Sequence, residues 1–358
     1  MRFPEFTEEW VNVSLKDVAD FQKERISSGL LDESTYISTE NILQNFQGVQ
    51  SAISIPANTN VVAYKKNDIL LSNIRPYLKK VWFSDKIGGC SADVFVLRSK
   101  TCEPKFLYNV IASDKFINYV MSGAKGVKMP RGDKNQMESF SFSIPAVAEQ
   151  RKISRLFQLL DEKIATQNKI IEKLQSLIKG LRVCCMQRVY GNNVYLSEIA
   201  QIYQPQTISS TELTEDGFLV YGANGIIGKY KDYNHETEQI CITCRGNTCG
   251  MVNYTKPMSW ITGNAMVINT DKYQDKVCKR YLYHYLSAYN FNSIISGSGQ
   301  PQIVRTPLEK LKITLPTISE QKQKAIIFDK IQDKIDINHK VLNLYIGQKQ
   351  YLLRQMFI

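Results

Sequence analysis

Arginine, asparagine and lysine side chains gather on one turn early in the chain. The run Ser72–Lys80 contains Asn73, Arg75, Tyr77, Lys79 and Lys80. Arginine can form paired hydrogen bonds with guanine, asparagine can do the same with adenine, and lysine neutralises phosphate. Tyr77 is equally well explained as a half-buried packing residue. The turn is therefore a candidate contact with nucleic acid.

Similar residues recur further along the chain. A second basic stretch in the first half, with glycines that let a backbone approach a ligand, contains Lys125, Lys128, Arg131 and Lys134. The second half places a comparable set on three turns: Asn224, Lys229, Arg245, Asn247, Thr248, Gln300, Gln302 and Arg305. Each cluster alone is a weak signal, because exposed polar turns are common. Their recurrence in both halves strengthens the interpretation as nucleic-acid contacts.

The motifs of catalysis that we searched for do not occur in the sequence. It has no phosphate-binding P-loop, no strand–Gly-x-Gly–helix unit and no Gly-x-Ser-x-Gly elbow. Only three histidines are present, and they are scattered. We therefore expect no catalytic residues, although carboxylates dispersed along the chain could still serve a nuclease.

Three cysteines stand at a spacing that resembles a zinc site. Cys241, Cys244 and Cys249 are not followed by a matching pair of ligands, since His235 and His284 are isolated. We expect thiols packed along a strand and its turn, and no metal. All eight cysteines occur in a chain without an export signal, which predicts reduced thiols and a cytoplasmic location.

The sequence contains an internal repeat. Pro145 opens a junction with the pattern Pro-x-x-x-Glu-Gln, and Pro316 opens the same junction 171 residues later. In each copy a mixed stretch of short strands and helices precedes the junction, and a long helical pattern follows it. Duplication predicts two similar globular heads and two similar helices.

Both long helices carry a seam of residues at alternating steps of four and three. In the first helix it includes Ile153, Phe157, Leu160, Ile164, Gln167, Ile171, Leu174 and Ile178. In the second helix it includes Phe328, Ile331, Ile335, Asn338, Leu342 and Tyr345. Such a seam predicts an antiparallel coiled coil. The polar exceptions Gln167 and Asn338 fall at equivalent places, so we expect them to share a polar layer, or else to be two independent polar positions.

A second apolar stripe flanks the seam. Its members are Leu156, Ile170, Leu177, Ile327 and Val341. Apolar residues beyond the two core positions indicate that more than two helices pack here, or that the stripe contacts the heads.

These patterns predict an α+β protein with a pseudo-twofold internal repeat. We expect mixed α/β heads at 1–149 and 191–319, and long helices at 150–190 and 320–358. Within the heads, helical spacing of apolar residues predicts helices over Phe106–Met121 and Arg280–Ile295. Short β-type runs predict strands at Val61–Tyr64, Asp68–Leu71, Asp93–Leu97, Glu238–Thr243 and Ala265–Ile268.

The net charge of the chain indicates what kind of molecule it binds. A formal charge of +11 favours an anionic partner, most simply nucleic acid. The sequence contains no apolar run of about 18 residues, so we expect no membrane span.

At these residues the chain resembles the specificity subunit of a type I restriction–modification system, over essentially its full length. The runs that carry the resemblance are Arg2–Phe6, Asp68–Tyr77, Tyr221–Gly228, Ser298–Gln302, and the junctions Pro145–Gln150 and Pro316–Gln321. One departure is that Lys128 and Met129 stand before Pro130, whereas Gly299 and Gln300 stand before Pro301.

The resemblance implies two target recognition domains, each reading one half of a bipartite double-stranded DNA sequence. It implies that the helices form a spacer that binds modification (methyltransferase) subunits, most simply two. Those subunits would bring S-adenosylmethionine, and restriction subunits would bring ATP and Mg; this chain would bind no cofactor itself. Two other classes stay open from the residues alone: a stand-alone nuclease, and a coiled-coil scaffold whose heads bind protein.

Overall fold

The computed structural model describes residues 2–187, 189–223, 225–297 and 299–357. The chain divides into two compact units. Unit 1 consists of Met1–Asn168 and Val341–Ile358, and unit 2 consists of Lys169–Lys340. Each unit holds one head together with a part of both long helices.

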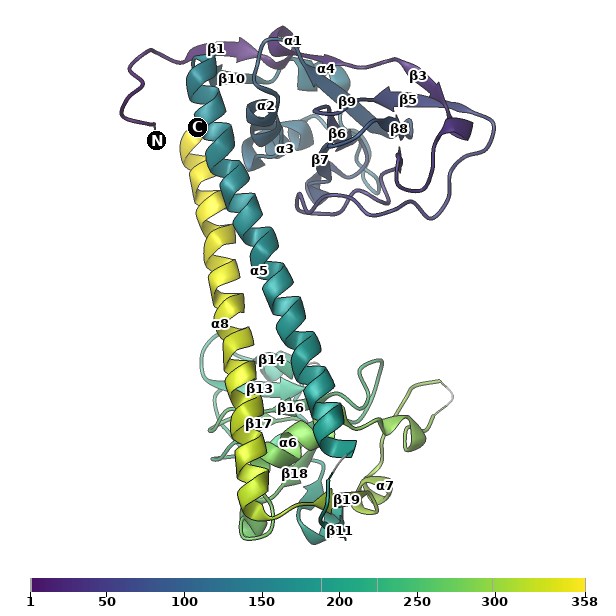
Figure 1. Ribbon diagram of the computed structural model, residues 1–358, viewed down its shortest axis with the longest axis vertical. Coiled ribbons are helices and arrows are strands. Elements are labelled where there is room, and N and C mark those ends of the chain that lie inside the picture. Colours follow the sequence, from purple (N-terminus) through teal and green to yellow (C-terminus); the bar gives the residue numbers. More distant parts are fainter. Residues whose placement is uncertain (1, 188, 224, 298, 358) are drawn as a thin grey trace. The chain divides into compact units, whose positions relative to one another are not determined.

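The head of unit 1 is built from short strands. They are β1 (Val11–Ser14), β2 (Ala19–Phe21), β3 (Arg25–Ser27), β4 (Tyr36–Ile37), β5 (Asn60–Tyr64), β6 (Ile69–Ser72), β7 (Val81–Phe83), β8 (Gly88–Cys90), β9 (Val94–Ser99) and β10 (Ser141–Ile144). They form one sheet in the order β2-β9-β6-β7, another in the order β3-β5-β8-β4, and the antiparallel pair β1-β10 (Figure 1). All four residues of β6 are buried, because the strand lies inside its sheet.

The head of unit 2 repeats this plan. Its strands are β11 (Asn192–Tyr195), β12 (Gln201–Tyr203), β13 (Phe218–Gly222), β14 (Gly225–Tyr230), β15 (Ile240–Thr243), β16 (Val252–Tyr254), β17 (Trp260–Ile261), β18 (Ala265–Asn269) and β19 (Lys312–Leu315). They form the sheets β12-β18-β15-β16 and β14-β13-β17 and the pair β11-β19. Strands β6, β7, β9 and β10 recur as β15, β16, β18 and β19, each 171 residues further along. The predicted α+β class with two similar heads is confirmed.

The helix predicted over Phe106–Met121 is wrong as a single element. The structure has α2 (Pro104–Ile111) and α3 (Asp114–Ser122) instead. Ser113 separates them, because its hydroxyl oxygen accepts a hydrogen bond from the Phe116 amide and caps a new helix. The apolar spacing continues across the break, which explains why periodicity alone did not detect it.

The helix predicted over Arg280–Ile295 is too long. Helix α6 covers Lys279–Ala288. Beyond it the Asn290 side chain accepts a hydrogen bond from the Asn292 amide and starts a separate 3₁₀ turn. A side-chain acceptor competes here with the helical hydrogen bonds and ends the helix.

The remaining short helices are α1 (Leu15–Val18), α4 (Lys134–Glu138) and α7 (Arg305–Glu309).

The long helices are α5 (Val147–Gln187) and α8 (Ile318–Met356). The Pro-x-x-x-Glu-Gln motif at the start of each long helix ends in a buried glutamine whose hydrogen bonds explain why the motif occurs twice. Gln150 donates to the Pro145 carbonyl and accepts from the Glu103 amide, which precedes α2. Gln321 donates to the Pro316 carbonyl and accepts from the Cys278 amide, which precedes α6. Each glutamine thereby ties the start of a long helix to its own head.

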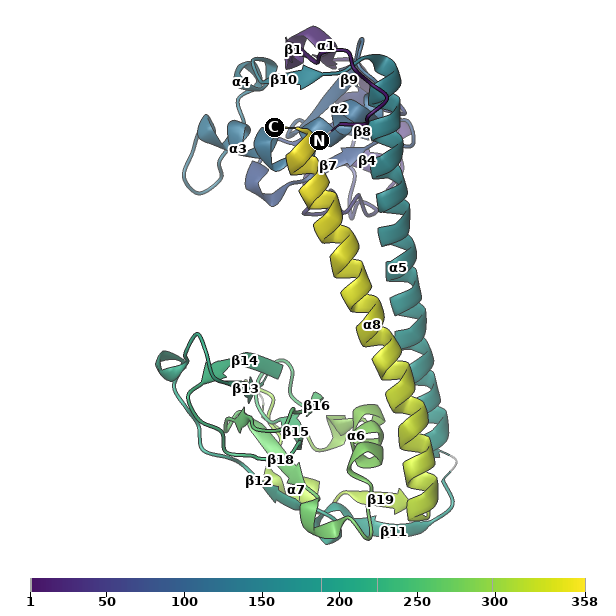
Figure 2. The same ribbon diagram turned by 90° about the vertical axis from the view of Figure 1, so that its left-hand side faces the viewer.

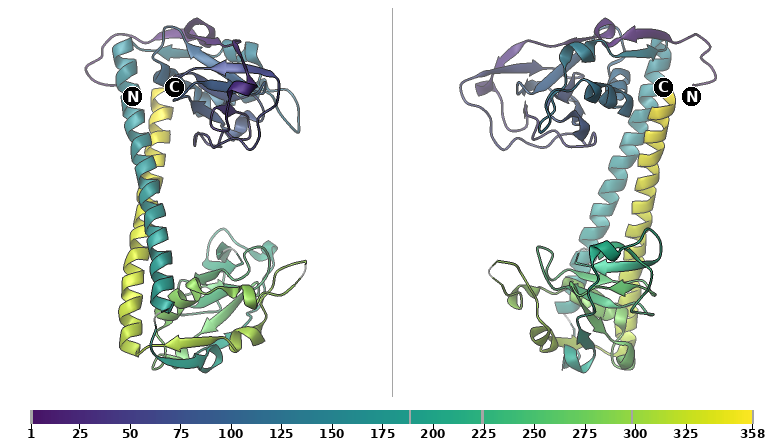
Figure 3. Two further views of the ribbon diagram at one scale, coloured as in Figure 1. Left: turned by 45° about the vertical axis from the view of Figure 1, so that its right-hand side comes forward. Right: turned by 180° about the vertical axis from the view of Figure 1, so that it is seen from behind.

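In unit 1 the two long helices run antiparallel. Phe157 of α5 stacks on Phe357, with ring centroids 6.2 Å apart, while Asp161 pairs with Lys349 at 2.6 Å. As the residue number rises from 157 to 161 along α5, the number of the contacting residue falls from 357 to 349, so the two segments run in opposite directions. Figure 3 shows the yellow end of α8 beside the teal α5. Both helices contribute to the core of this head, and so does Phe357, which directly follows α8. The helix residues in this core are Ile153, Phe157, Leu160, Leu352 and Met356.

In unit 2 the helices share a smaller apolar cluster. Ile178 of α5 packs with Phe328 and Ile335 of α8, and all three side chains are at most 4% exposed. Helix α6 lies alongside α8 (Figure 2), and the ring of its residue His284 packs against Phe328.

The predicted seam positions are buried or half-buried in their own units. Fully buried are Ile153, Phe157, Leu160, Gln167, Ile171, Ile178, Phe328 and Ile335; half-buried are Ile164, Leu174, Ile331, Asn338, Leu342 and Tyr345. Gln167 belongs to unit 1 and Asn338 to unit 2. Their pairing in one polar layer stays a prediction.

Candidate nucleic-acid interfaces

Two segments of the first head that the sequence singled out lie together. The Arg75 amide donates to the Pro130 carbonyl at 2.8 Å, and the Gly132 amide donates to the Asn73 carbonyl at 3.0 Å. These bonds join the turn after β6 to the basic stretch before α4. They place the side chains of both segments at one edge of the head.

Arg75 holds an unfavourable backbone conformation there. Its φ is +50°, in the left-handed region that suits glycine and costs other residues free energy. The side chain is exposed, and within the described residues it has no hydrogen-bond or ion-pair partner. A strained residue with an unpaired cation is typical of a binding site, where the surrounding structure maintains the strain.

The other basic residues of this head divide into two groups. Several are already paired: Lys79 with Asp114, Lys80 with the Thr39 carbonyl, Arg131 with Asp93, and Lys134 with Glu138. Lys128 is exposed, and Tyr77 is 47% exposed. Asn73 is half-buried, and its Oδ1 atom lacks a hydrogen-bond partner in the part of the chain that the structure describes. Arg75, Tyr77 and Lys128 are therefore the predicted contacts best placed to meet a ligand.

The second head has the same backbone arrangement. The Gly246 amide donates to the Pro301 carbonyl, and the Ile303 amide donates to the Cys244 carbonyl, both at 3.0 Å. The backbones of Arg245 and Gln302 form an isolated antiparallel β-bridge, and those of Ile74 and Arg131 form the equivalent β-bridge in the first head. The loops Lys128–Pro130 and Gly299–Pro301 differ in sequence, yet both proline carbonyls accept the equivalent bond.

A third turn joins this site in the second head. The Thr248 hydroxyl donates to the Ala223 carbonyl at 3.3 Å, which ties the Arg245–Thr248 turn to the end of β13. Arg245 and Asn247 are exposed, as are Gln300 and Gln302, whereas Lys229 pairs with Asp216 and Arg305 pairs with Glu309. The predicted contact Asn224 lies outside the described residues.

Sequence reasoning missed the acidic residues that neutralise these cations. Asp93 and Asp114 are distant in sequence from Arg131 and Lys79, with which they pair, whereas Asp216 precedes its partner Lys229 in the same part of the chain. It also missed Val127, which is 100% exposed at the tip of the first basic loop. A lone apolar residue among glycines and lysines was the one available signal for that tip.

The cysteines with zinc-like spacing lie in the head of unit 2. Cys241 is buried inside β15, and its burial raises the pKa of the thiol to about 12. Cys244 is also buried, and Cys249 is half-buried. Among the described residues, no three His, Cys, Asp or Glu side chains are grouped as metal ligands would be. In the same ranges, none of the helices combines the length and apolar composition that crossing a membrane requires.

The structure defines a class of protein with a duplicated α+β head, an exposed arginine on a turn of each head, and a pair of long helices. The family model described as type I restriction modification DNA specificity domain matches residues 7–176 and 192–344. The chain belongs to this family. The nuclease and scaffold alternatives are not favoured.

Relatives agree with this assignment. The type I restriction enzyme MjaVIII specificity subunit of Methanocaldococcus jannaschii is 24% identical over 93% of this chain and 88% of its own length. The EcoprrI specificity subunit of Escherichia coli is 31% identical over 40% of this chain, and the match spans only 36% of that protein. The crystal structure of the S subunit from M. genitalium aligns with a TM-score of 0.69 at 16% identity, over 98% of this chain and 96% of that one.

Proposed function

We propose that this chain is the noncatalytic DNA-recognition subunit of a type I restriction–modification complex. Each head would read one half of a bipartite double-stranded DNA sequence, and the long helices would dock modification subunits, two in the simplest assembly. One observation carries the proposal: the same pair of backbone bonds forms on the turn of each head, beside an exposed arginine. The arginine is Arg75 itself in the first head and Arg245, next to the bonded Gly246, in the second, and neither side chain has a hydrogen-bond or ion-pair partner among the described residues.

The division of labour follows from the chemistry of the two surfaces. Base edges are read by side chains such as arginine, and most affinity comes from phosphate contacts of a basic protein. S-adenosylmethionine would be held by the modification subunits, and ATP and Mg by the restriction subunits. This chain would supply recognition and spacing, in the cytoplasm.

The test is co-expression with a type I modification subunit that is active with its own specificity subunit. We expect adenine methylation in one gapped, two-part motif when the host genome is sequenced. A stable complex that leaves every adenine unmethylated would contradict the proposal. Divalent-metal-dependent cleavage by the chain alone would favour a nuclease, and the absence of salt-dependent DNA binding by the complex would favour a scaffold.

The second apolar stripe of the helices supports docking of partner subunits. Leu156 packs against the core of the first head, so the head accounts for that position. Ile170, Leu177 and Ile327 are 38%, 50% and 55% exposed. Apolar residues at such exposure on long helices are suited to further helices of a partner.

Replacing Ile327 with glutamate should therefore weaken binding of the modification subunit. We expect a loss of at least about tenfold in affinity, or roughly 1.4 kcal/mol, because a charge would be buried in the interface. Folding should change by less than about 0.5 kcal/mol, since the side chain is exposed in the free chain. Gln323→Glu is the matched control, as it adds the same charge at an exposed position of α8. The affinity of each variant for the modification subunit is measured by titration. If Ile327→Glu binds that subunit as tightly as the Gln323→Glu control does, the helix face that contains Ile327 is not the docking surface.

A further inference from the structure

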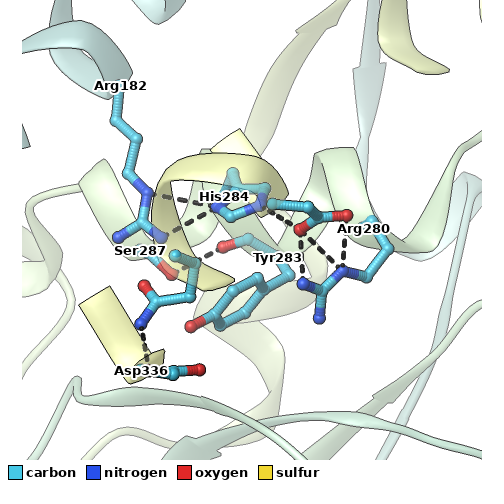
Figure 4. Close-up of polar contacts among 8 residues, drawn as sticks. Arg182, Arg280, Tyr283, His284, Ser287 and Asp336 are labelled. Carbon is cyan, nitrogen blue, oxygen red and sulfur yellow. Dashed lines mark hydrogen bonds and ion pairs between the residues drawn. The ribbon is translucent and has the colours of Figure 1, made fainter. Parts of the chain in front are cut away.

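A polar cluster joins α6 to both long helices within unit 2. His284 of α6 is fully buried. Arg182 of α5 and Asp329 of α8 each hydrogen-bond one of its ring nitrogens. Figure 4 shows Arg182 and Arg280 on opposite sides of the His284 ring. The cluster thus connects three elements that are distant in sequence.

The contacts determine which nitrogen of His284 carries the proton. Arg182 approaches Nδ1 with Nε at 3.2 Å and a terminal nitrogen at 2.8 Å. A guanidinium has only N–H donors, so Nδ1 must accept with its lone pair. The proton therefore resides on Nε2, which donates to Asp329 Oδ1 at 2.8 Å. His284 must be neutral for both bonds to exist.

The same carboxylate also binds Arg280, from the first turn of α6. The Arg280 Nε atom lies 2.9 and 3.0 Å from the two oxygens of Asp329. Its guanidinium lies over the ring of Tyr254, 4.3 Å from the centroid. Two aromatic rings pack against the His284 ring. The centroid of Tyr283 lies 4.9 Å from that of His284, and the centroid of Phe328 of α8 lies 5.0 Å from it. These rings help to bury the His284 imidazole, which is 0% exposed, whereas the side chains of Arg280 and Asp329 stay 33% and 27% exposed. The bonds to the buried ring are therefore the ones strengthened by low polarity around them.

The first head has the corresponding positions without the histidine and the carboxylate. Glu103 and Cys278 are equivalent, because each donates its amide to the junction glutamine of a long helix. Counting from them, Asn109 corresponds to His284, and Lys105 corresponds to Arg280. Lys105 bonds Gln158 of α5 at 2.8 Å, where Arg280 bonds Asp329. A neutral amide therefore stands in unit 1 at the place of the carboxylate.

We propose that Arg182, Arg280, His284 and Asp329 form a protonation-sensitive clamp that positions the second head on the long helices. Two guanidiniums face one carboxylate in the cluster, so a neutral imidazole leaves it with an excess of positive charge. A proton on Nδ1 would add a third cation and would point an N–H at the donors of Arg182. The clamp therefore opens on acidification, and the first head has no equivalent response.

The direction of the pH effect follows from linkage. Burial lowers the pKa of His284 below 6.5; the hydrogen bond to Asp329 opposes this shift, and Arg182 and Arg280 reinforce it. Between the lowered pKa and 6.5, the unfolded segment binds a proton that the folded one excludes. The stabilising contribution is therefore complete above pH 6.5 and is lost progressively as the pH falls below it.

Hydrogen exchange of the whole chain tests the clamp without reference to DNA binding. Exchange of the α6 amides, corrected for intrinsic rates, should accelerate between about pH 7.5 and pH 5.5 by up to about tenfold per unit below the ordinary histidine pKa. Exchange of α2 in the first head should show no such step. Equal responses in α2 and α6 would overturn the proposal.

Substitutions separate the proton from the packing. His284→Asn, which copies Asn109, places an amide oxygen where it can still accept from Arg182 at the position of Nδ1. The shorter side chain does not replace the Nε2 bond to Asp329, which keeps its pair with Arg280, and it cannot be protonated. It should keep α6 protected at neutral pH and lose the step. His284→Leu should exchange faster at every pH, without a step.

The control is His235→Asn. His235 is the other buried histidine of unit 2, and it bonds Tyr203 and Asn234 within the head rather than the helices. This variant should retain the step in α6. A step that persists in His284→Asn, or that disappears in His235→Asn, would refute the clamp.

Discussion

Replacing Phe157 with alanine is expected to lower the free energy of unfolding of unit 1 by about 3–5 kcal/mol. Phe157 is 1% exposed and packs in the core of the first head. It stacks on Phe357, which in turn meets Phe106 of α2 edge to face, with centroids 5.4 Å apart. Removal of the ring leaves a cavity at the point where α5, the end of α8 and the head meet. The neighbouring aromatic rings cannot collapse into it without breaking their own contacts.

Phe328 is the matched position in unit 2, 171 residues further along. It is also 1% exposed and lies among Ile178, Ile335 and the His284 ring. Phe328→Ala should cost a similar free energy, but the loss should appear in unit 2. Hydrogen exchange resolved by segment measures this directly: faster exchange in α2 and β6 for Phe157→Ala, and in α6 and β15 for Phe328→Ala.

Tyr351→Ala controls for a general effect of removing an aromatic ring from α8. Tyr351 is 55% exposed in unit 1, so its loss should change stability by less than about 0.5 kcal/mol. If Phe157→Ala costs no more than this control, the packing of α5 on the first head is not what stabilises unit 1. If both phenylalanine variants loosen the same segments, the two units do not respond separately.

Replacing Arg75 with glycine is expected to weaken discrimination at one half of the DNA target only, while leaving the fold intact. The backbone of Arg75 is left-handed, and the equivalent position of the second head is Gly246, with φ +88°. Glycine adopts this conformation without strain, so the turn and its bond to Pro130 should persist. Only the guanidinium is lost. If it pairs with a guanine, the cost is about 1–3 kcal/mol, or roughly 5- to 150-fold in affinity.

The measurement uses the purified complex and DNA duplexes in which either half of the target is altered. Arg75→Gly should lose affinity for the intact target and show no further loss when the base pair that Arg75 reads is altered, as a scan of single base pairs in its own half would show. Arg245→Ala should show the same behaviour for the other half. A loss that is equal on unrelated DNA sequences would assign these arginines to phosphates. Unchanged affinity for the intact target would remove Arg75 from the interface.

Arg131→Ala provides an internal comparison within the same head. Arg131 already pairs with Asp93 at 2.8 Å, so part of its charge is compensated before DNA arrives. Its removal should therefore weaken binding less than removal of the unpaired Arg75.

The sequence by itself determined the duplicated plan, the α+β class and the existence of the two long helices. These follow from repetition and from apolar spacing, which are properties of neighbouring residues along the chain. The strands near Val61, Ile69, Val94, Ile240 and Ala265 were predictable for the same reason, because each is a short apolar run between turn residues.

Helix ends were not predictable from spacing. Ser113 and Asn290 end the apparent helical runs with side-chain hydrogen bonds, and the apolar period continues past both residues. A capping bond is worth only about 1 kcal/mol, so the signal that breaks a helix is weaker than the pattern that predicts it.

Only the tertiary structure decided which of the predicted contact residues are available. The turn at Asn73 and Arg75 meets the loop at Pro130 through backbone bonds between segments more than fifty residues apart. The carboxylates that engage Lys79 and Arg131 likewise come from distant elements. The cluster around His284 needs α5, α6 and α8 together. Charge pairing and burial depend on which segments pack against one another, and no local pattern in the chain encodes that.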